Sequence, residues 1–459
     1  MTTESTARRP FHAVILAGGR GTRMQSTLPK LLHPIAGRAL LQWVIDAAQR
    51  AGAASVTVVL PPNEPLLSQA CTDVQQVVQP VPLGTGDALR CAMPMLVQDD
   101  LPVAVIYGDT PFLQAETIGA MIAAVGQANS DARQGDTPPA ILLLATRAAE
   151  PNAYSRLLMD AGGQVTGLVE WLDASPVQRA LPLSFAGAMA LQRQPLAALL
   201  AGLDNHNAKQ EFYLTQLVAL ANGGGLGVRA HEVAEAEIMG INTQAELAQA
   251  ESLAQDRLRA AALAAGVRMA APTTVFFSAD TQIAAGCVVE PHVVFGGGVT
   301  VAAGCHIKAF CYLEDVTLAT GVEVGPFARL GPDATLGAGV VVGNFVEVKR
   351  ARLGAGVKAK HLAYLGNVQI GAGSNIAAGV VVCNYNGFSK STTVIGAGAF
   401  VGSNSVLIAP LTIGDAAYVA AGSTITDPVP NDALAIGRSP QVTKPDGATR
   451  LRQKYSKKS

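Results

Sequence analysis

The sequence predicts two domains of different class, an α/β domain with a mostly parallel sheet followed by a β-helix. Short apolar runs alternate with helix-length stretches over residues 13–242, an alanine-rich stretch covers 243–267, and aliphatic residues recur every six positions after Pro272. A chain of 459 residues can hold two or more domains, each with its own core. We therefore expect a first domain over 1–242, a linker helix over 243–267, and a β-helix domain over 268–459 that ends in a basic, solvated tail.

The composition excludes several classes of protein. Hydrophobic residues make up 49% of the chain and charged residues 15%, which indicates a globular protein. A net charge of −1 provides no basic field for nucleic acid or an acidic membrane. The six cysteines contain no CxxC pair and no metal-ligand spacing, as expected in a reducing compartment. Residues 1–12 lack a signal-peptide core and no apolar run is long enough to span a membrane, so we expect a soluble cytoplasmic protein without nucleic-acid or membrane partners.

A glycine-rich turn follows the first predicted strand. The apolar run 13–16 is short enough for a buried strand, and it continues into LAGGRGTRMQSTLPK over residues 16–30. The glycines leave backbone N–H groups open to an anion, and Arg20, Arg23 and Lys30 add positive charge. This combination is typical of a nucleotide-phosphate site, although glycine turns after strands are common.

The other elements of the first domain place a carboxylate at the same edge of the sheet. The patterns predict a helix over 40–51 and strands over 56–60, 103–107 and 141–145. Asp109 follows the strand 103–107 directly. Because ligands of parallel α/β sheets bind beyond the carboxyl ends of the strands, we expect the glycine turn and Asp109 to face one ligand.

The linker stretch predicts a long helix. Residues 243–267 are rich in Ala, Leu, Gln and Glu and contain no proline and no glycine until their end. Their position between two domains favours a connecting arm. A coiled coil is the weaker alternative, because alanine would fill most of its seam.

The second half of the chain repeats with a period of six. One of its runs consists of Val324, Leu330, Leu336, Val342 and Val348. Neither a helix nor a simple strand has this period, whereas the hexapeptide repeat of a β-helix does; an irregular β-sandwich is the alternative. The repeat is interrupted over 352–367 and over 384–393, where we expect polar chemistry and, in the second case, a projecting loop.

Several longer motifs are more specific than any of these patterns. They are LAGGRGTRM…LPK, LGTGDA, YGD, GNFVEVK, HLAYLG, CNYNG and FVGS. Through them the chain from 13 to 438 resembles the family of bifunctional bacterial enzymes that make UDP-N-acetylglucosamine. The resemblance implies a Rossmann-like nucleotidyltransferase domain and a left-handed parallel β-helix. It also implies two reactions, which are N-acetylation of glucosamine-1-phosphate by acetyl-CoA and then uridylyl transfer from UTP to N-acetylglucosamine-1-phosphate, with pyrophosphate release.

The resemblance assigns roles at the uridylyl site. Arg23 and Lys30 would hold phosphates, and the oxygens of Asp109 and Asn242 would hold one Mg²⁺. As alternatives, Asp109 could be a turn acid and Asn242 a helix N-cap. Gln79, Gly84 and Thr85 would read the uracil, within a nucleotide-binding set of Leu16, Ala17, Gly18, Gly19, Lys30, Gln79, Gly84, Thr85, Tyr107 and Asp109.

The sugar side of this site departs from the family pattern. By resemblance the sugar would contact Ser155, Glu170, Phe185, Thr215 and Asn242. Ser155 replaces the glycine of Tyr-Gly-Arg, and Phe185 replaces a sugar-binding asparagine. A lost polar contact costs about 1–3 kcal/mol, and a phenylalanine could also block the pocket. N-acetylglucosamine-1-phosphate is the expected sugar.

For acetyl transfer the resemblance points to a histidine. His361 would be the general base, because imidazole titrates near neutral pH, and Glu347 would orient it. The backbone N–H of Ala378 would meet the oxyanion. The amino-sugar phosphate would contact Lys349, Tyr364, Asn375 and Lys390, and acetyl-CoA would contact Ala378, Asn384, Tyr385, Ser403, Ala421 and Arg438.

The acetyl-transfer site also departs from the family pattern at two positions, and the resemblance implies an oligomeric state. Gly331 replaces an arginine that helps to bind the substrate phosphate, which leaves Lys349 and Lys390 as its cations, so weaker substrate binding is expected. Ala377 replaces a glycine. β-Helix acyltransferases of this kind are trimers with acetyl-CoA bound between subunits, which implies a homotrimer. The alternatives are an enzyme with only one activity, a nucleotidyltransferase for a different sugar-1-phosphate, and a non-catalytic scaffold.

Overall fold

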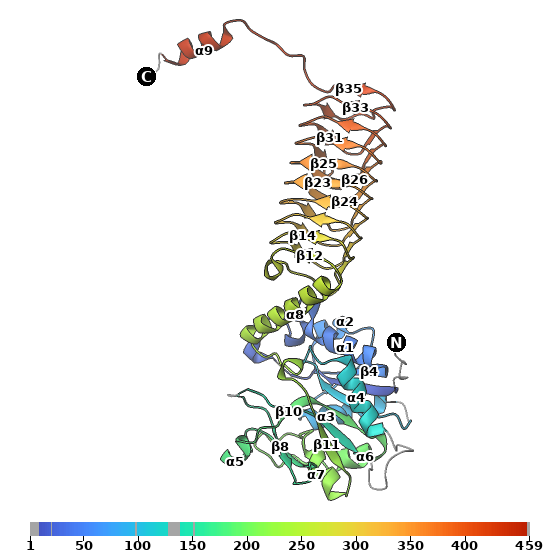
Figure 1. The fold of residues 1–459 in the computed structure, drawn as a ribbon, viewed down its shortest axis with the longest axis vertical. Coiled ribbons are helices and arrows are strands. Elements are labelled where there is room, and N and C mark those ends of the chain that lie inside the picture. The colour runs from blue at the N-terminus through green and yellow to red at the C-terminus, as the bar shows by residue number, and fades with distance from the viewer. Residues whose placement is uncertain (1–8, 20, 97–98, 127–137, 150–151, 457–459) are drawn as a thin grey trace. The chain divides into compact units, whose positions relative to one another are not determined.

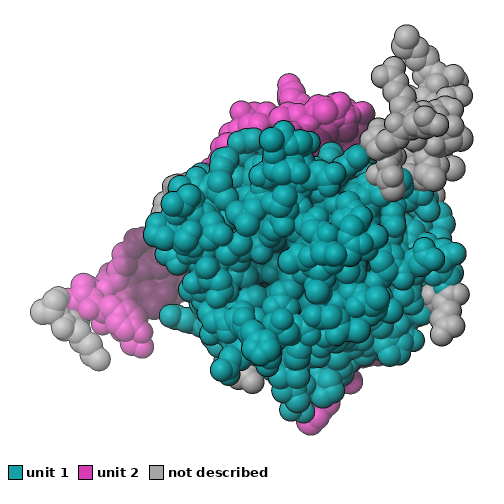
Figure 2. All heavy atoms as spheres, turned by 90° about the horizontal axis from the view of Figure 1, so that it is seen from below, with its two compact units in different colours: residues 1–254 teal, residues 255–459 magenta. Residues whose placement is uncertain are grey.

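The fold is taken from a computed structural model that describes residues 9–19, 21–96, 99–126, 138–149 and 152–456 (Figure 1). Arg20, one of the expected phosphate-site cations, lies outside these residues. The chain divides into two compact units, Met1–Ala254 and Gln255–Ser459, which Figure 2 colours teal and magenta. Each unit has its own hydrophobic core and is described by itself.

Unit 1 contains a nine-stranded, mostly parallel sheet, which confirms the expected α/β class. The strand order is β11–β7–β10–β6–β1–β4–β5, with β8 attached to β10 and β9 attached to β8. β10 runs antiparallel to both β6 and β7, whereas β1, β4, β5 and β6 are parallel neighbours. The strands are β1 Phe11–Leu16, β4 Ala53–Leu60, β5 Gln75–Val78, β6 Val103–Tyr107, β7 Ile141–Thr146, β8 Arg156–Met159, β9 Val165–Val169, β10 Ser184–Leu191 and β11 Val228–Glu232; β2 Pro34–Ile35 and β3 Arg38–Ala39 form a separate hairpin.

Helices cover both faces of this sheet. Because side chains alternate along a strand, Ala13 and Ile15 of β1 pack on one face and Val14 and Leu16 on the other, in two separate core clusters. α1 Leu40–Ala51 and α4 Ala115–Gly126 contribute to the first cluster, and α3 Thr85–Ala92, α6 Arg193–Ala201 and α7 Gln216–Gly223 to the second. The short helices are α2 Pro65–Ala70 and α5 Pro176–Arg179.

The glycine turn and Asp109 leave the sheet at the same edge, as expected. Leu16 at the end of β1 is in register with Tyr107 at the end of β6, and Gly108 N–H donates to the Leu16 carbonyl at 3.0 Å. The two segments that follow these strands therefore begin side by side.

The linker helix is α8, Gln244–Ala264, slightly shorter than the expected 243–267. It begins with a reciprocal cap, in which Thr243 Oγ1 accepts from Glu246 N–H at 3.2 Å and Glu246 Oε2 accepts from Thr243 N–H at 2.9 Å. The division between the two units falls inside this helix. Within the described part of the chain, no helix has the length and apolarity needed to cross a membrane.

Unit 2 is a parallel β-helix, which confirms the interpretation of the six-residue period. Its strands stack coil upon coil (Figure 1), and every strand pair in its two sheets is parallel, unlike the antiparallel pairing of a β-sandwich. The inward aliphatic residues, such as Val289, Ile307 and Val324, are fully buried.

The strands of unit 2 are short and form two sheets. One sheet contains β12 Arg268–Met269, β14 Val288–Val289, β17 His306–Ile307, β20 Glu323–Val324, β23 Val341–Asn344, β25 Lys358–His361, β27 Asn375–Ile376, β30 Phe400–Val401, β33 Tyr418–Val419 and β35 Leu434–Ala435. The other contains β13 Gln282–Ile283, β15 Val294–Phe295, β16 Val299–Val301, β18 Tyr312–Leu313, β19 Val316–Leu318, β21 Arg329–Leu330, β22 Ala334–Leu336, β24 Glu347–Leu353, β26 Tyr364–Ile370, β28 Val381–Cys383, β29 Thr393–Ile395, β31 Val406–Ile408, β32 Leu411–Ile413 and β34 Thr424–Ile425.

One of the two expected interruptions is wrong. The coil continues through 352–367, because β24, β25 and β26 pair with the coils before and after them. The inward positions here include the alanines Ala359 and Ala363, which are buried but too small to mark the aliphatic period. The second interruption, 384–393, is confirmed as a loop between β28 and β29, and Phe388 in it is 96% exposed.

The C-terminal tail contains a helix that the sequence analysis did not expect. α9, Gly447–Ser456, has no buried residue, which agrees with a solvated tail, and residues 457–459 lie outside the described part of the chain.

Candidate active sites

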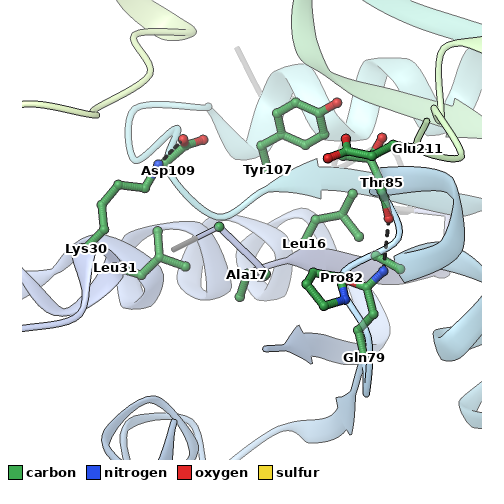
Figure 3. A pocket seen from close by; sticks show the side chains of 14 residues that line it. Leu16, Ala17, Lys30, Leu31, Gln79, Pro82, Thr85, Tyr107, Asp109 and Glu211 are labelled. Carbon is green, nitrogen blue, oxygen red and sulfur yellow. Dashed lines mark hydrogen bonds and ion pairs between the residues drawn. The ribbon is translucent and has the colours of Figure 1, made fainter. Parts of the chain in front are cut away.

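A cavity of about 270 Å³ lies at the carboxyl ends of β1 and β6 (Figure 3). Every residue of the predicted nucleotide-binding set lines it, together with Leu31, Pro82, Ala88 and Glu211. Arg23 does not line it; this residue is exposed on the short turn η1, Thr22–Met24. The cavity therefore brings together the expected nucleotide residues, with the exception of the arginine.

A cluster of three polar side chains lies at one end of the cavity; Lys30 and Asp109 line it, and Asn242 contacts Lys30 from beside it. Lys30 Nζ lies 2.6 Å from Asp109 Oδ2 and 3.1 Å from Asn242 Oδ1. Asn242 is fixed by the start of α8, because its N–H donates to Glu246 Oε2 at 2.6 Å, and Ile241 N–H donates to the Asp109 carbonyl at 3.1 Å. A cation and two oxygen donors thus converge beside the glycine turn.

The other end of the cavity is built by the segment 83–86 and the chain at 211–214. Phe212 N–H donates to the Leu83 carbonyl at 2.7 Å, and Thr85 Oγ1 accepts from Leu214 N–H at 3.0 Å. Gln79 is 3% exposed, and its Nε2 donates to the Gly84 carbonyl at 3.0 Å. Gln79 and Thr85 therefore lie together at the end opposite Lys30, as Figure 3 shows.

A second cavity of about 200 Å³ shares Tyr107 and Asp109 with the first. Four of the five predicted sugar residues, Ser155, Glu170, Phe185 and Asn242, line it. Thr215 lies behind Glu170, since its Oγ1 donates to Glu170 Oε1 at 3.0 Å. Ser155 Oγ donates to the other carboxylate oxygen, Oε2, at 2.7 Å. The serine that replaces the family's glycine therefore gives Glu170 a second hydroxyl partner.

The wall of the second cavity is apolar around Phe185. This side chain is 5% exposed and packs edge-to-face on Tyr107, with ring centroids 6.1 Å apart. Burial, together with the carboxylates of Glu170 and Asp109, raises the pKa of Tyr107, so its phenol stays neutral. Because Phe185 forms part of the wall, it leaves the cavity open but offers no polar contact.

The sequence analysis did not anticipate a role for Arg156. This arginine is fully buried, and its Nη1 donates to Asn152 Oδ1, to the Tyr154 carbonyl and to Ser184 Oγ. It therefore anchors the segment that carries Ser155. The only signal in the sequence was its place in the Tyr-Ser-Arg motif.

In unit 2, four of the predicted acetyl-site residues form a column along one corner of the coil. Successive backbone bonds join Leu362 to Asn344, Gly379 to His361, Asn404 to Ala378 and Gly422 to Ser403. His361, Ala378, Ser403 and Ala421 are therefore stacked, one per coil. Arg438 extends the column, because its Nε donates to the Ala421 carbonyl at 2.9 Å.

The partner of His361 differs from the expected one. His361 Nδ1 lies 2.8 Å from Asn344 Oδ1, on the strand of the preceding coil, whereas Glu347 is in register with Tyr364 in the other sheet. The expectation that Glu347 orients His361 is corrected to Asn344. Since an amide oxygen only accepts, Nδ1 carries the proton and Nε2 is left to accept one.

The other predicted substrate residues lie on neighbouring coils. Lys349 is in register with Gly366, where an added Cβ would lie 2.5 Å from Tyr364 Oη and 2.8 Å from Asn384 Nδ2. A glycine is thus needed for the phenol and the amide to approach. Asn375 is on β27, and Tyr385 and Lys390 pair across the loop 384–393.

The glycine that replaces a family arginine is required by the backbone. Gly331 has φ 105°, and a Cβ there would overlap the Glu314 carbonyl oxygen. An arginine at this position would need a different backbone path, so the loss of the cation accompanies a change in the turn itself.

Comparison with known proteins agrees with this geometry. The MobA-like NTP transferase domain family matches residues 13–175, and the bacterial transferase hexapeptide family (six repeats) matches residues 392–427. Three relatives, each named bifunctional protein GlmU, match nearly the whole chain. The protein of Paramagnetospirillum magneticum is 44% identical over 445 residues (97% of each chain), that of Sphingopyxis alaskensis 45% over 450 (98% of each), and that of Acidiphilium cryptum 46% over 446 (97% of this chain and 99% of the relative).

Proposed function

Because this chain belongs to the family of bifunctional GlmU proteins, we propose that it carries out uridylyl transfer in unit 1 and acetyl transfer in unit 2. It is a nucleotidyltransferase and an acetyltransferase that makes UDP-N-acetylglucosamine. The observation that best supports the assignment to units is the cluster of Lys30, Asp109 and Asn242 at the nucleotide cavity.

In the uridylyl transfer, UTP would occupy the first cavity, with its base at Gln79 and Thr85 and its phosphates at Lys30. An oxygen of the sugar-1-phosphate attacks the α-phosphorus in line, and the bond from that phosphorus to the bridging oxygen breaks as pyrophosphate leaves. The protein positions the reactants and neutralises the negative charge that develops on the phosphates. The Lys30 ammonium would supply the neutralising positive charge. Arg23, which is exposed outside the cavity, would help only if its segment closes over the phosphates.

The oxygen pair at Asp109 and Asn242 fits a magnesium ion. Both oxygens approach the same ammonium, so one cation is able to contact both, and Mg²⁺ is usually held by one or two protein oxygens plus substrate phosphates. When bound there, Mg²⁺ would neutralise charge on the phosphates of UTP. Lys30 would then shift from the carboxylate to the phosphates.

N-acetylglucosamine-1-phosphate is the sugar we propose for the second cavity. Glu170, held by Ser155 and Thr215, keeps lone pairs for sugar hydroxyl groups. The apolar wall at Phe185 suits the acetamido methyl group, although it supplies no polar contact to the amide. Pyrophosphate release with UTP over a panel of sugar-1-phosphates tests this choice; a preference for a sugar without the acetamido group would favour the alternative substrate.

In the acetyl transfer, His361 Nε2 would take the proton that the glucosamine amine loses as its nitrogen attacks the thioester carbonyl carbon. The bond from that carbon to sulfur then breaks, and the thiolate of CoA leaves. Asn344 holds the ring, and the Ala378 N–H, in the same column, would donate to the oxyanion. Lys349 and Lys390 would meet the substrate phosphate. The corner column supports this arrangement because it places the base and the acetyl-CoA residues on consecutive coils.

We further propose a homotrimer in the cytoplasm. An aromatic ladder runs along the same corner as His361: His292, Phe310, Phe327 and Phe345 stack with centroids 4.9, 4.8 and 5.3 Å apart. The three phenylalanines are 51%, 47% and 56% exposed. A column of this kind favours packing against another copy, which would lie beside the acetyl site. The six free cysteines support a reducing compartment.

A further inference from the structure

Asp87 lies outside the first cavity but contacts Gln79, one of the residues that line it. It lies in the first turn of α3, and its Oδ2 accepts from Gln79 Nε2 at 2.8 Å. The same Nε2 also donates to the Gly84 carbonyl at 3.0 Å. Both protons of the buried Gln79 amide nitrogen are therefore in use.

These two contacts decide which way the amide of Gln79 points. A carbonyl and a carboxylate are both acceptors, so the reversed amide would set Oε1 against two acceptors. The observed orientation turns Oε1 toward Gly18, whose added Cβ would lie 3.3 Å from it. Gln79 and Gly18 both line the cavity, and among the described residues Oε1 accepts no hydrogen bond. Gln79 Oε1 is therefore available to accept a hydrogen bond from a ligand in the cavity.

We propose that Asp87 is a positioning residue that sets the base specificity of the nucleotide site. A uracil presents a donor at N3 and an acceptor at O4. Its N3–H would donate to Gln79 Oε1, and its O4 would accept from a backbone N–H at the start of α3, where the first N–H groups of a helix have no intrahelical partner. A cytosine in the same pose presents an acceptor at N3 and a donor at N4, so both contacts become repulsive. This proposal rests on the proposed uridylyl transfer.

The test compares UTP with CTP in the full chain. Asp87→Asn keeps the size of the side chain but gives Gln79 a partner that also donates, so the amide is free to reverse. We expect kcat/KM for pyrophosphate release to fall with UTP and rise with CTP, so that the UTP-to-CTP ratio drops at least about tenfold. Glu116→Gln, which also removes a carboxylate from the first turn of a helix (α4) but lies outside the cavities, should leave the ratio unchanged.

The possible results distinguish a failure of the role of Asp87 from a failure of the proposed uridylyl transfer. If the unaltered chain releases no pyrophosphate with UTP, the proposed function fails. If it does, and Asp87→Asn changes both rates equally or leaves the ratio within about twofold, the role of Asp87 is overturned. The melting temperature of unit 1, which contains Asp87, reports whether the variant is correctly folded. A measurement on the unaltered chain does not depend on the variant: 3-methyl-UTP, which lacks the N3–H, should be rejected about as strongly as CTP, and its ready use would contradict the proposal.

Discussion

The ammonium of Lys30 and the carboxylate of Asp109 are 2.6 Å apart, although 79 positions separate them in the chain. The contact arises because β1 and β6 are neighbours and end at the same edge of the sheet. Their side chains are only 9% and 21% exposed, so the pair is shielded from bulk solvent. The order of the strands therefore brings together the two charged groups that we assign to uridylyl transfer.

Ser155 offers a test of the sugar subsite. Replacing it with glycine removes the hydroxyl that donates to Glu170 Oε2, so the carboxylate loses one of its two holding contacts. We expect KM for the sugar-1-phosphate to rise about 5- to 10-fold while KM for UTP is unchanged. Ser155→Thr keeps the hydroxyl and serves as the control. An equal rise of both KM values would mean that the serine only stabilises the fold.

Asn344 should matter to acetyl transfer alone. Asn344→Ala removes the acceptor of the His361 Nδ1–H and leaves the ring free to turn. We expect CoA-thiol release to slow about tenfold, because a misdirected base loses part of its contribution, and pyrophosphate release to stay the same. Asn344→Asp keeps an acceptor and should be less impaired. Unchanged CoA release in Asn344→Ala would remove this residue from the mechanism.

A contact at the opposite edge of the sheet predicts a pH dependence of stability. Partial desolvation raises the pKa of Asp99, but hydrogen bonds from His12 and the Leu101 N–H, with the charges of His12 and Arg193, outweigh it and leave the pKa below its ordinary value of 3.8. A lowered carboxyl pKa stabilises the fold above the unfolded value, and this stabilisation is lost as the pH falls through the folded value.

Asp99→Asn should therefore lower the melting temperature of unit 1 at neutral pH. The difference from the unaltered chain should shrink as the pH falls below 3.8. Thermal unfolding followed over a pH series measures this. A difference that persists unchanged into acid would mean that the contact works through packing rather than through charge.

The aromatic ladder predicts the effect of a charge on assembly. Phe327 lies in the middle of the ladder and is 47% exposed. Phe327→Glu should shift the mass measured by light scattering from trimer toward monomer, because a buried unpaired charge is costly at an interface. Phe388→Glu, at an exposed position in the loop 384–393, is the matched control. A trimer that withstands the change at Phe327 would place the interface elsewhere.

The β-helix and the site at the edge of the parallel sheet were predictable from the sequence. The six-residue period follows from one inward side chain on each face of the coil. The cluster of Lys30, Asp109 and Asn242 follows from strands that end at the same edge of the sheet and from the motifs shared with the family. The period failed as a guide over 352–367 because Ala359 and Ala363 fill the interior without being large aliphatic residues.

Individual side-chain pairs were harder to predict, since they depend on stacking between distant segments. Asn344 and His361 are 17 positions apart, which is one coil, so the coil length itself could have revealed the pair. Ser155 and Glu170 lie opposite each other at the end of the β8–β9 hairpin, in which Arg156 is in register with Val169, so the hairpin register would have revealed this pair. No comparable signal joined Asp87 to Gln79, because that contact crosses between a loop and a helix.

The most direct test of two separate active sites is a pair of variants assayed for both reactions in the full chain. Lys30→Ala should lower UTP-dependent pyrophosphate release by at least about 100-fold and leave CoA-thiol release unchanged. His361→Ala should do the reverse, with a loss of about 100-fold or more in CoA release. If either variant instead lowers both reactions together, or neither, the assignment of one reaction to each unit is contradicted.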